Sequence, residues 1–389
     1  MARGRNRVNE GMNLVPDALA LSEAVPDKTG VFEIRKGVFL EVLEKQTYKA
    51  HRNFRASLPS SDGIEPGFDA GPVYVVYADD SHIDIQAGLT LIDGRPVRET
   101  AVVPKLFASY PGVSPEELAN APRIDDGCVV LPLASQRMGN YCRWWLDSVA
   151  KLFVCSRSAI LRENLRGSTL DVVVPELQTS FQKQAVDLLS WRPLVSSNRN
   201  DRILRGRTVN SAGLTFGGGQ RIGAMVREMA RFLDLLLPAP ARHSRDRSGE
   251  LLYVTRNESS MRRILNEADL LPGLKDLGFR VISPASLSLP EQIDAFRNAR
   301  IVLSAHGAQL TNIIFCRPKT TLIEIFPEMG VHGSAFSRIA SQLGFPYYFA
   351  VGEKVENRQS KKNPNNSDLI LDKTAFLSFV RQIVDTESA

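Results

Sequence analysis

The apolar and polar positions in the last third of the chain predict strands and helices in turn. Runs with the length and composition of buried strands lie at residues 251–255, 279–282, 301–303, 322–326 and 347–350. Helical spacing of apolar positions predicts helices between them, at residues 262–267, 291–299 and 335–343. This alternation predicts a parallel sheet with helices on both faces. Ligands of such sheets bind at the carboxyl ends of the strands, where Arg256 and His306 lie.

The first two thirds of the chain are less regular, and about the first 70 residues show little pattern. Strands are predicted at 73–77, 128–131 and 169–174, and helices at 139–153, 178–189 and 222–237. Residues 238–250 are charged, contain proline and have few apolar side chains, which favours an interdomain linker. We therefore predict an α/β domain at 1–237, a linker at 238–250, a second α/β domain at 251–355, and a tail at 356–389 that ends in a helix.

A turn of small residues follows the strand at 301–303 and contains His306, Gly307 and Ala308. Helical spacing resumes at Leu310, and the strand at 322–326 completes the unit. At the start of such a helix, the free backbone N–H groups and the positive end of the helix dipole favour phosphate. This unit is the first reason to expect a nucleotide-type ligand.

Composition and charge narrow the class of protein. With 43% hydrophobic and 23% charged residues, the 389-residue chain is typical of globular proteins. No apolar run approaches the roughly 18 residues of a spanning helix, and the basic N-terminus lacks the apolar core of a signal peptide. We therefore expect a cytoplasmic protein, with peripheral contact to the inner face of the membrane as an open alternative.

The net charge of +5 and the arginine-rich stretch at 202–263 have three open explanations. They are a phosphate-lined cleft, contact with an anionic membrane, and arginines that coat exposed helices. A nucleic-acid partner is disfavoured, because aromatic residues are not interleaved with the basic ones. The four cysteines show no C-x-x-C spacing and predict reduced thiols rather than a zinc site.

The turn after residue 303 carries a family resemblance. His306-Gly-Ala-Gln-Leu-Thr-Asn312, with the strand that follows, resembles the H-G-A-G-L-T-N pattern of family 61 glycosyltransferases. Gln309 replaces the second glycine, and its side chain would narrow the room for a phosphate. The resemblance covers roughly residues 140–352. It implies an α/β fold of two Rossmann-like domains that face a cleft (GT-B-like), with the C-terminal helix packed back on the first domain.

A second motif lies in the helix predicted at 139–153. Asn140, Arg143 and Asp147 share one helical face, which alone is typical of a solvated face with an Arg–Asp pair of small value. Family 61 members carry N-x-x-H-x-x-x-[DE] here, so Asn140 and Asp147 match, whereas Arg143 stands in place of the histidine. The resemblance implies that Asp147 and Arg143 are catalytic, with Asp147 as the base, and that Asn140 contacts the donor sugar or the acceptor.

The remaining site residues follow from the same resemblance. Arg256 would grip the diphosphate, and Arg263, in the family's R-x-x-N-E segment, would orient Arg256 or cap its loop. The phosphate or nucleotide would lie at the helix start, against His306, Gly307, Ala308 and Gln309. Asn312, one turn further, is expected to hold the turn by hydrogen bonds.

Two more candidates lie after these. Glu324 is in a buried strand, where its carboxylate needs a partner. Ribose hydroxyls and a buried salt bridge are both open as that partner. His332, in the loop after this strand, would contact the donor sugar or serve as a rival base.

These residues predict an inverting glycosyltransferase that uses a nucleotide sugar, expected by family analogy to be a UDP-sugar. The acceptor would be a glycan, a lipid-linked glycan or another hydroxyl compound, in polysaccharide biosynthesis. Metal-dependent sugar transferases usually show Asp-x-Asp, which this chain lacks, so we expect no metal cofactor and fixed donors instead. A degenerate, non-catalytic nucleotide- or glycan-binding scaffold remains the alternative. A dinucleotide oxidoreductase is disfavoured, because no G-x-G-x-x-G follows a strand.

Overall fold

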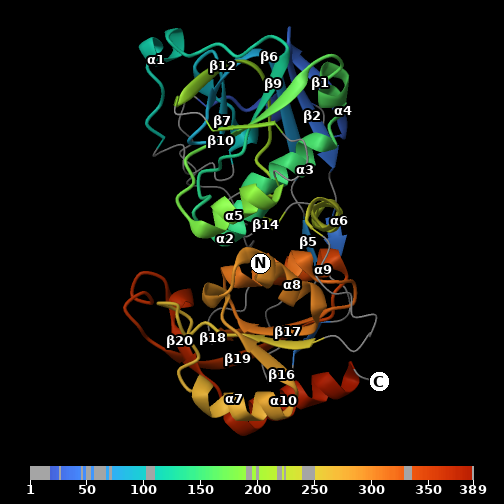
Figure 1. Ribbon diagram of the computed structural model, residues 1–389, viewed down its shortest axis with the longest axis vertical. Helices are drawn as coiled ribbons and strands as arrows, with labels where there is room; N and C mark the ends of the chain where they lie inside the picture. Colours follow the sequence, from blue (N-terminus) through green and yellow to red (C-terminus); the bar gives the residue numbers. More distant parts are fainter. Residues whose placement is uncertain are drawn as a thin grey trace, which may run out of the picture.

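Two lobes, each built on one main β-sheet, make up the protein (Figure 1). The computed structural model describes residues 18–25, 28–44, 47–49, 54–56, 67–69, 72–101, 110–189, 195–198, 201–216, 221–222, 225–238, 250–327 and 335–387. The fold is mixed α/β, as the sequence predicted. None of the described helices is long and apolar enough to cross a membrane.

The first lobe contains a nine-stranded mixed sheet. Its main order is β1 (Gly30–Arg35), β2 (Val38–Glu44), β6 (Val73–Asp84), β12 (Ile203–Asn210), β9 (Cys128–Pro132), β10 (Thr169–Val174) and β11 (Val195–Asn198). Two more strands, β7 (Leu89–Ile92) and β8 (Arg95–Pro96), extend from β6. Only β9 to β12 include parallel pairs, and the others are antiparallel. The prediction of a Rossmann-like first domain is therefore wrong for this half, because connections as short as that between β1 and β2 allow only antiparallel pairing.

One long helical segment of the first lobe carries the second sequence motif. It begins as α2 (Tyr141–Arg143), continues as a π-helical stretch at Trp144–Val149, and ends as α3 (Ala150–Ser156). Gly213, with φ +79°, packs against this stretch so closely that an added Cβ would lie 2.5 Å from the carbonyl oxygen of Asp147. The lobe also contains α1 (Pro115–Ala119), α4 (Ala159–Asn164), α5 (Ser180–Leu189) and α6 (Val226–Leu236).

The second lobe contains the parallel sheet that the sequence predicted. Its order is β16 (Phe279–Ile282), β15 (Glu250–Val254), β17 (Ala299–Ala305), β18 (Thr321–Pro327), β19 (Tyr347–Val355) and β20 (Asp368–Ile370). All neighbours are parallel except β20, which is antiparallel to β19. The strand β4 (Phe54–Ala56) also pairs with β19, so these early residues lie in the second sheet rather than in the first lobe. The predicted domain boundaries otherwise stay a prediction.

The two faces of this sheet explain its continuous apolar strands. Leu252, Val302 and Leu322 belong to the core beneath α8 (Leu289–Asn298), the 3₁₀ helix η6 (Ala308–Phe315) and α9 (Ala335–Leu343). Their neighbours in sequence, such as Leu251 and Ile301, pack on the opposite face against α7 (Glu267–Asp276) and α10 (Lys373–Thr386). Because side chains alternate across a strand, burial of both faces requires an unbroken apolar run.

Two predictions for the second half of the chain are wrong. The helix predicted at 262–267 begins only at Glu267, because the preceding residues are held by the tail, where Ile264 forms a bridge with Leu369. The C-terminal helix does not pack back on the first domain. Its apolar face, with Phe376 and Val380, packs on α7 and the second sheet, at the end of the molecule away from the first lobe (Figure 1).

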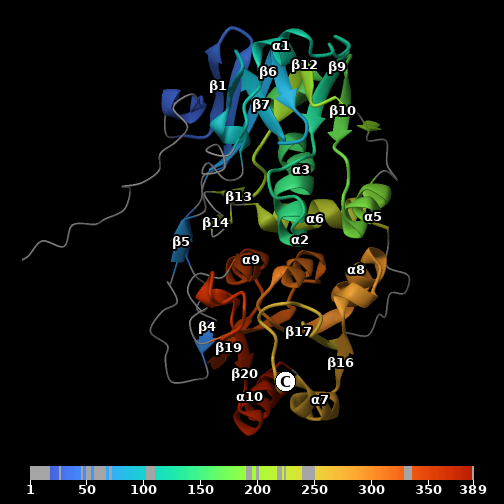
Figure 2. The same ribbon diagram turned by 90° about the vertical axis from the view of Figure 1, so that its left-hand side faces the viewer.

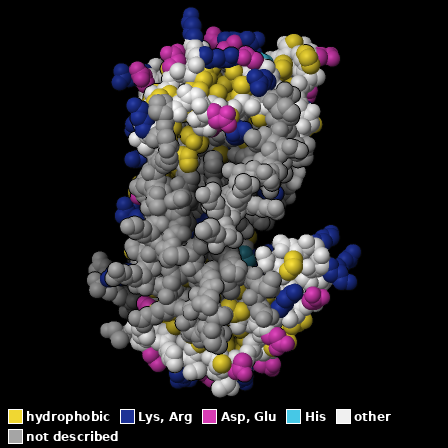
Figure 3. All heavy atoms as spheres, turned by 180° about the vertical axis from the view of Figure 1, so that it is seen from behind, with side chains coloured by type: hydrophobic (Ala, Val, Ile, Leu, Met, Phe, Trp, Pro, Cys, Tyr) yellow, Lys and Arg dark blue, Asp and Glu magenta, His cyan; other side chains and the backbone are white. Residues whose placement is uncertain are grey.

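The lobes share one hydrophobic core where their helices meet. Figure 2 shows α5 and α6 of the first lobe facing α8 and α9 of the second. Trp145 of the π-helical stretch meets Phe315 of η6 edge to face, with ring centroids 5.0 Å apart. The lobes are therefore joined where these helices meet. Seen from behind, acidic and basic side chains are intermixed at both ends of the molecule (Figure 3).

Shorter elements complete the description. They are β3 (Thr47–Lys49), β5 (Gly67–Asp69), β13 (Thr215–Phe216), β14 (Arg221–Ile222), and the 3₁₀ turns η1 (Leu21–Ala24), η2 (Arg98–Thr100), η5 (Pro284–Ser286) and η7 (Pro364–Asn366).

A lysine lies in the core of the first lobe. Lys151 on α3 is fully buried, and its Nζ donates to the carbonyl of Gly88 at 3.1 Å and to Oδ1 of Asn210 at 3.0 Å. Burial lowers the pKa of Lys151 from its ordinary 10.5 to about 7, although Cys155 and Asp147 act in the opposite direction. Keeping this lysine charged inside the fold therefore costs stability.

Substitution of Lys151 should change how stability depends on pH. Between about pH 7 and pH 10.5 the unfolded chain binds more protons at this lysine than the folded chain, so the free energy of unfolding should rise with pH. In Lys151→Met this slope should fall by up to about 1 kcal/mol per pH unit. The Gly88 carbonyl keeps its hydrogen bond from Nδ2 of Asn210, at 3.0 Å. Urea unfolding at pH 7, 8 and 9 measures the slope.

The exposed Lys183→Met is the control for the loss of one positive charge. Equal slopes in the wild type and in Lys151→Met would contradict the prediction.

Candidate functional site

The strand order of the second sheet defines where its crevice lies. Counted along the chain, the order of its first five strands is 2-1-3-4-5, as in doubly wound nucleotide-binding sheets. The order reverses between β15 and β17, and Val254 pairs with Ser304 near the carboxyl ends of these strands. A ligand binds outside such a reversal. The segments that leave the two strands there contain Arg256 and Gly307.

Arg256 and Gly307 are in direct contact. A Cβ atom added to Gly307 would lie only 1.6 Å from Nη1 of Arg256, so the guanidinium occupies the space that any other side chain would fill. Nη1 also donates to Oε1 of Gln309. The amide nitrogen of Gln309 in turn donates to Oγ of Ser304 at 3.0 Å and to the carbonyl of Ala305 at 2.8 Å. Gln309 therefore fixes Arg256 at the end of β17, and it occupies one Nη of that guanidinium.

A second arginine, Arg262, lies beside Arg256 and was not predicted from the sequence. Its Nη1 donates to the carbonyl of His306 at 3.4 Å. Burial and then the neighbouring charge of Arg262 lower the pKa of Arg256 to about 10, so both groups stay charged at neutral pH. Burial also lowers the pKa of Arg262. In the described part of the chain, the buried Nε of each arginine has no hydrogen-bond partner. Two cations with unused donors are thus held together.

Glu267 fixes the loop that carries Arg256. Its buried carboxylate, at the start of α7, accepts hydrogen bonds from the hydroxyl of Thr255 at 2.8 and 2.9 Å and from the side-chain amide of Asn257. The hydroxyl of Tyr253 on β15 donates to it at 2.5 Å. Glu267 thus binds the residues on both sides of Arg256, and it was also missed, because its role depends on three bonds within the folded loop.

His306 and Glu324 form a pair inside the second lobe. Nδ1 of His306 lies 2.5 Å from Oε1 of Glu324, whose other oxygen accepts from the hydroxyl of Tyr347 at 2.7 Å. Glu324 is fully buried, whereas the His306 side chain is 28% exposed and stacks on Phe326. Of the two partners that the sequence left open for Glu324, the structure shows the buried pair. A carboxylate bound to Nδ1 fixes the tautomer of the imidazole, so Nε2 is the ring nitrogen left for a ligand or a proton.

Ala308 begins η6, which has Gly307 as its N-cap residue without a side-chain cap. The dipole of this helix therefore adds positive potential next to the two arginines. Asn312 is fully buried further along, where its Oδ1 accepts from the hydroxyl of Tyr141 and its Nδ2 donates to Gln292 at 3.2 Å. Asn312 thus links the two lobes through Tyr141, whereas the sequence predicted that it holds its own turn.

The side chain of Arg263 pairs with Asp368 rather than with Arg256, so the first of its two predicted roles, to orient Arg256, is wrong. Its Nη2 lies 2.8 Å from Oδ2 of Asp368, and its backbone N–H donates to Oδ1 at 2.8 Å. The side-chain amide of Asn266 donates to the carbonyl of Leu371 and accepts from its backbone N–H. The R-x-x-N segment therefore attaches the C-terminal strand to the lobe, since its side chains point toward β20.

The N-terminal motif lies against the second lobe. Asn140 is the N-cap of α2, and its Oδ1 accepts from the backbone of Cys142 and Arg143 at 3.0 and 3.3 Å. Arg143 is paired with Asp147 at 3.6 Å, and the Asp147 side chain is fully buried. The link between Tyr141 and Asn312 brings this motif against η6. The catalytic roles of Asp147 and Arg143 stay predictions, as does the sugar contact of Asn140.

The contacts described above do not test two further predictions, the role of His332 and the absence of a metal. His332 falls outside the described residues. In the described part of the chain, no group of three or more His, Cys, Asp or Glu side chains is arranged to hold a metal ion. Metal independence itself stays a prediction.

Part of the chain resembles a known protein family. The family model described as Glycosyltransferase 61 matches residues 141–323. Beta-1,2-xylosyltransferase of Arabidopsis thaliana is 32% identical over 78 residues, which are 20% of this chain and 14% of that protein. The chain thus matches only a small part of the length of this curated relative.

Two similar solved structures are of TibC. One is the bacterial iron-containing dodecameric glycosyltransferase from enterotoxigenic E. coli H10407, with 13% identity and a TM-score of 0.31 over 72% of this chain and 88% of that chain. The other is the iron-containing heptosyltransferase in complex with ADP-D-beta-D-heptose, with 13% identity and a TM-score of 0.31 over 70% and 72%. Over the residues that these two comparisons match, the chain is similar to glycosyltransferase family 61.

Proposed function

We propose that this chain is an inverting, metal-independent glycosyltransferase that moves a sugar from a nucleotide-sugar donor to a hydroxyl acceptor. The observation that carries the proposal is the pair of guanidinium groups, Arg256 and Arg262, held together at the reversal of the second sheet. A UDP-sugar is the proposed donor, and a glycan or lipid-linked glycan in polysaccharide biosynthesis the proposed acceptor. The proposed location is the cytoplasm, with peripheral contact to the inner face of the membrane.

The electrostatics of the pair favour a diphosphate. Two like charges in a partly buried site repel one another, and that repulsion is stronger at low dielectric than in water. An anion between them removes the repulsion. Two N–H groups of one arginine can donate to two oxygens of the same phosphate. Hydrogen bonds between charged groups are roughly twice as strong as those between neutral groups.

The same groups suit the departure of a nucleoside diphosphate. Negative charge develops on the leaving group during sugar transfer, and fixed donors aimed at that charge lower the barrier. Before any ligand arrives, Arg256 is held by Gln309 and by the loop that Glu267 binds, and Arg262 donates to the carbonyl of His306. Such preorganisation means that little reorganisation is needed during the reaction.

The acceptor hydroxyl needs a base. Asp147 is the proposed base on the family pattern, but its fully buried carboxylate is paired with Arg143. His306 is a second candidate, because Glu324 fixes its Nδ1 and leaves Nε2 to accept a proton. A carboxylate of this kind orients an imidazole base in other enzymes.

A non-catalytic scaffold is the second candidate function, and Gln309 is the observation that favours it. Its Oε1 occupies Nη1 of Arg256, a donor that a phosphate oxygen would otherwise use. Such a protein would bind nucleotide or glycan without turnover, which distinguishes the two candidates.

Donor hydrolysis tests the proposed function directly. Purified protein incubated with UDP-, GDP- and CMP-sugars should release one nucleoside diphosphate or monophosphate slowly, because water replaces the acceptor. Release should persist in EDTA, since fixed cations rather than a metal stabilise the leaving group. Nucleotide binding without release would favour the scaffold, and release that requires added Mn²⁺ would contradict metal independence.

Arg262→Met should weaken anion binding. It removes one of the two charges but keeps a long side chain, so we expect pyrophosphate affinity, measured by titration calorimetry, to fall about 10- to 100-fold. Arg280→Ala is the matched control, because Arg280 is 52% exposed on the same sheet and pairs with Glu250. Unchanged pyrophosphate affinity in Arg262→Met would show that the arginine pair is not the anion site.

Gly307→Ala should displace Arg256 without unfolding the chain. The φ of Gly307 is 170°, an extended conformation open to alanine, yet its Cβ would lie 1.6 Å from Nη1 of Arg256. We expect at least tenfold weaker pyrophosphate binding with folded-state circular dichroism retained. In the control Gly127→Ala, the added Cβ meets only the Asp125 carboxylate, at 3.3 Å. Wild-type affinity in Gly307→Ala would mean that the position of Arg256 does not matter for binding.

A further inference from the structure

The surface that joins the two lobes is apolar at its centre. Trp145 of the π-helical stretch is fully buried and meets Phe315 of η6 edge to face. The same hydrophobic core continues from Leu146 and Met229 of the first lobe to Leu310 of the second. Domains joined by small polar interfaces usually move relative to one another, whereas a large apolar interface opposes that motion. The core between these lobes is of the second kind.

Hydrogen bonds join the lobes at two places around this core. The backbone N–H of Leu289, at the start of α8, donates to Oε1 of Gln184 on α5 at 2.7 Å. On α9, Oε1 of Gln342 accepts from the backbone of Val226 at 3.1 Å, and its carbonyl accepts from Nε of Arg227 at 2.8 Å. Figure 2 shows α5 with α8, and α6 with α9, at separate positions along the interface.

A buried arginine holds the chain where it leaves the first lobe. Nη1 of Arg297 on α8 donates to the carbonyl of Pro238 at 2.6 Å, and its Nη2 pairs with Asp234 of α6 at 3.0 Å. Pro238 is the first residue of the predicted linker. Because few contacts cross a linker, an interdomain hinge usually lies there. Here the start of the linker is bound to the second lobe, which restricts a hinge at this point.

A strand from the early part of the chain joins the lobes at a third place. In sequence β4 lies between β2 and β6 of the first sheet, yet it pairs in parallel with β19 of the second, with Phe54 opposite Tyr347. The strands on either side of it, β3 and β5, pair with each other. Figure 2 shows β4 and β5 on the side of the molecule opposite α5 and α8. The third contact is therefore separate from the helical ones.

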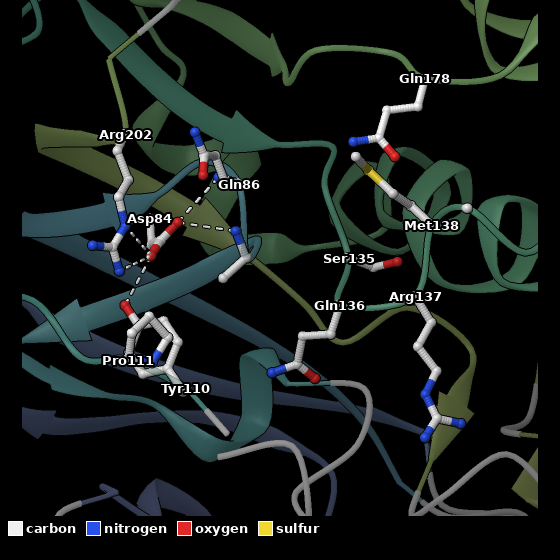
Figure 4. A pocket seen from close by; sticks show the side chains of 12 residues that line it. Asp84, Gln86, Tyr110, Pro111, Ser135, Gln136, Arg137, Met138, Gln178 and Arg202 are labelled. Carbon is white, nitrogen blue, oxygen red and sulfur yellow. Dashed lines mark hydrogen bonds and ion pairs between the residues drawn. The ribbon is translucent and has the colours of Figure 1, made fainter. Parts of the chain in front are cut away.

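Each lobe is also fixed by hydrogen bonds of its own. In the first lobe, the buried carboxylate of Asp84 accepts from Nε and Nη2 of Arg202 at 3.2 and 3.1 Å and from the hydroxyl of Tyr110 at 2.9 Å (Figure 4). This network forms one wall of a pocket of about 420 Å³, and all residues that line the pocket belong to the first lobe. In the second lobe, Glu267 fixes the loop with Arg256 in the same way.

We propose that the two lobes form one rigid body that unfolds as a unit, and that ligands bind without rotation of one lobe against the other. A single contact would allow the lobes to turn about it, whereas contacts at three separate places resist such rotation. The arginine pair and the helical segment with Asp147 then stay at a fixed distance with and without a ligand. Preorganisation of this kind reduces the free energy lost on binding. The inference goes beyond the proposed function and does not depend on it.

Urea unfolding of the full chain tests whether the lobes unfold together. The three tryptophans, Trp144, Trp145 and Trp191, all precede residue 237, so their fluorescence reports the first lobe, whereas circular dichroism reports both lobes. We expect the two signals to give one transition with the same midpoint. Pyrophosphate at about 100 times its dissociation constant should raise both midpoints equally. Two separate transitions in the wild type would overturn the inference.

A change at the far end of the second lobe gives a sharper test. Phe376 of α10 is buried against α7, away from the first lobe. In Phe376→Ala we expect the tryptophan midpoint to fall by the same amount as the dichroism midpoint, because loss of a core ring destabilises the whole unit. Phe376→Leu is the milder variant if Phe376→Ala does not fold. Gln382→Ala, at an exposed position on α10, should leave both midpoints unchanged. A tryptophan midpoint unaffected by the loss of Phe376 would contradict cooperative unfolding.

Small-angle X-ray scattering tests the fixed orientation of the lobes. The curves of the full chain with and without saturating pyrophosphate should superimpose, and a smaller radius of gyration with the ligand would show that the lobes close. Calorimetry establishes separately that pyrophosphate binds. If it does not bind, the proposed anion site fails, and the comparison of the two unfolding signals still decides this inference.

Discussion

The close approach of Arg256 to Gly307 is the constraint on which the candidate site depends. It requires glycine at the end of β17, and it places a guanidinium at the reversal of the second sheet. Glu267 and Gln309 hold that guanidinium from two sides, while Arg262 adds a second positive charge. A fold keeps two such cations together at a cost in free energy, and a bound anion offsets this cost.

The sequence predicted the second sheet well because its strands are buried on both faces. Such strands are continuous apolar runs, and all five predicted runs are strands. Arg256 and His306 were also predicted as candidates, since Arg256 directly follows one of these runs and His306 lies in the turn after another. Arg262 was not, because the order of its segment is set by Leu369, more than a hundred residues away, and no local pattern reports that contact.

The first lobe was harder to predict for the same physical reason. Antiparallel strands and the pairing of β4 with β19 are determined by contacts between distant segments, which apolar periodicity does not specify. The position of the C-terminal helix also depends on contacts between distant segments. Its amphipathic pattern predicted a helix correctly, but the choice of surface depended on the apolar face of α7, which only the folded lobe presents.

Gln309 limits how a phosphate could be bound at the candidate site. A guanidinium has five donors, and in Arg256 the amide of Gln309 takes one at Nη1, while Ser259 and the carbonyl of Met261 take those of Nη2. Nε and one hydrogen of Nη1 remain. Gln309 is neutral, so it leaves the positive potential of the arginine pair intact. The change from glycine therefore narrows the geometry in which a phosphate can be bound but does not remove the electrostatic basis for binding it.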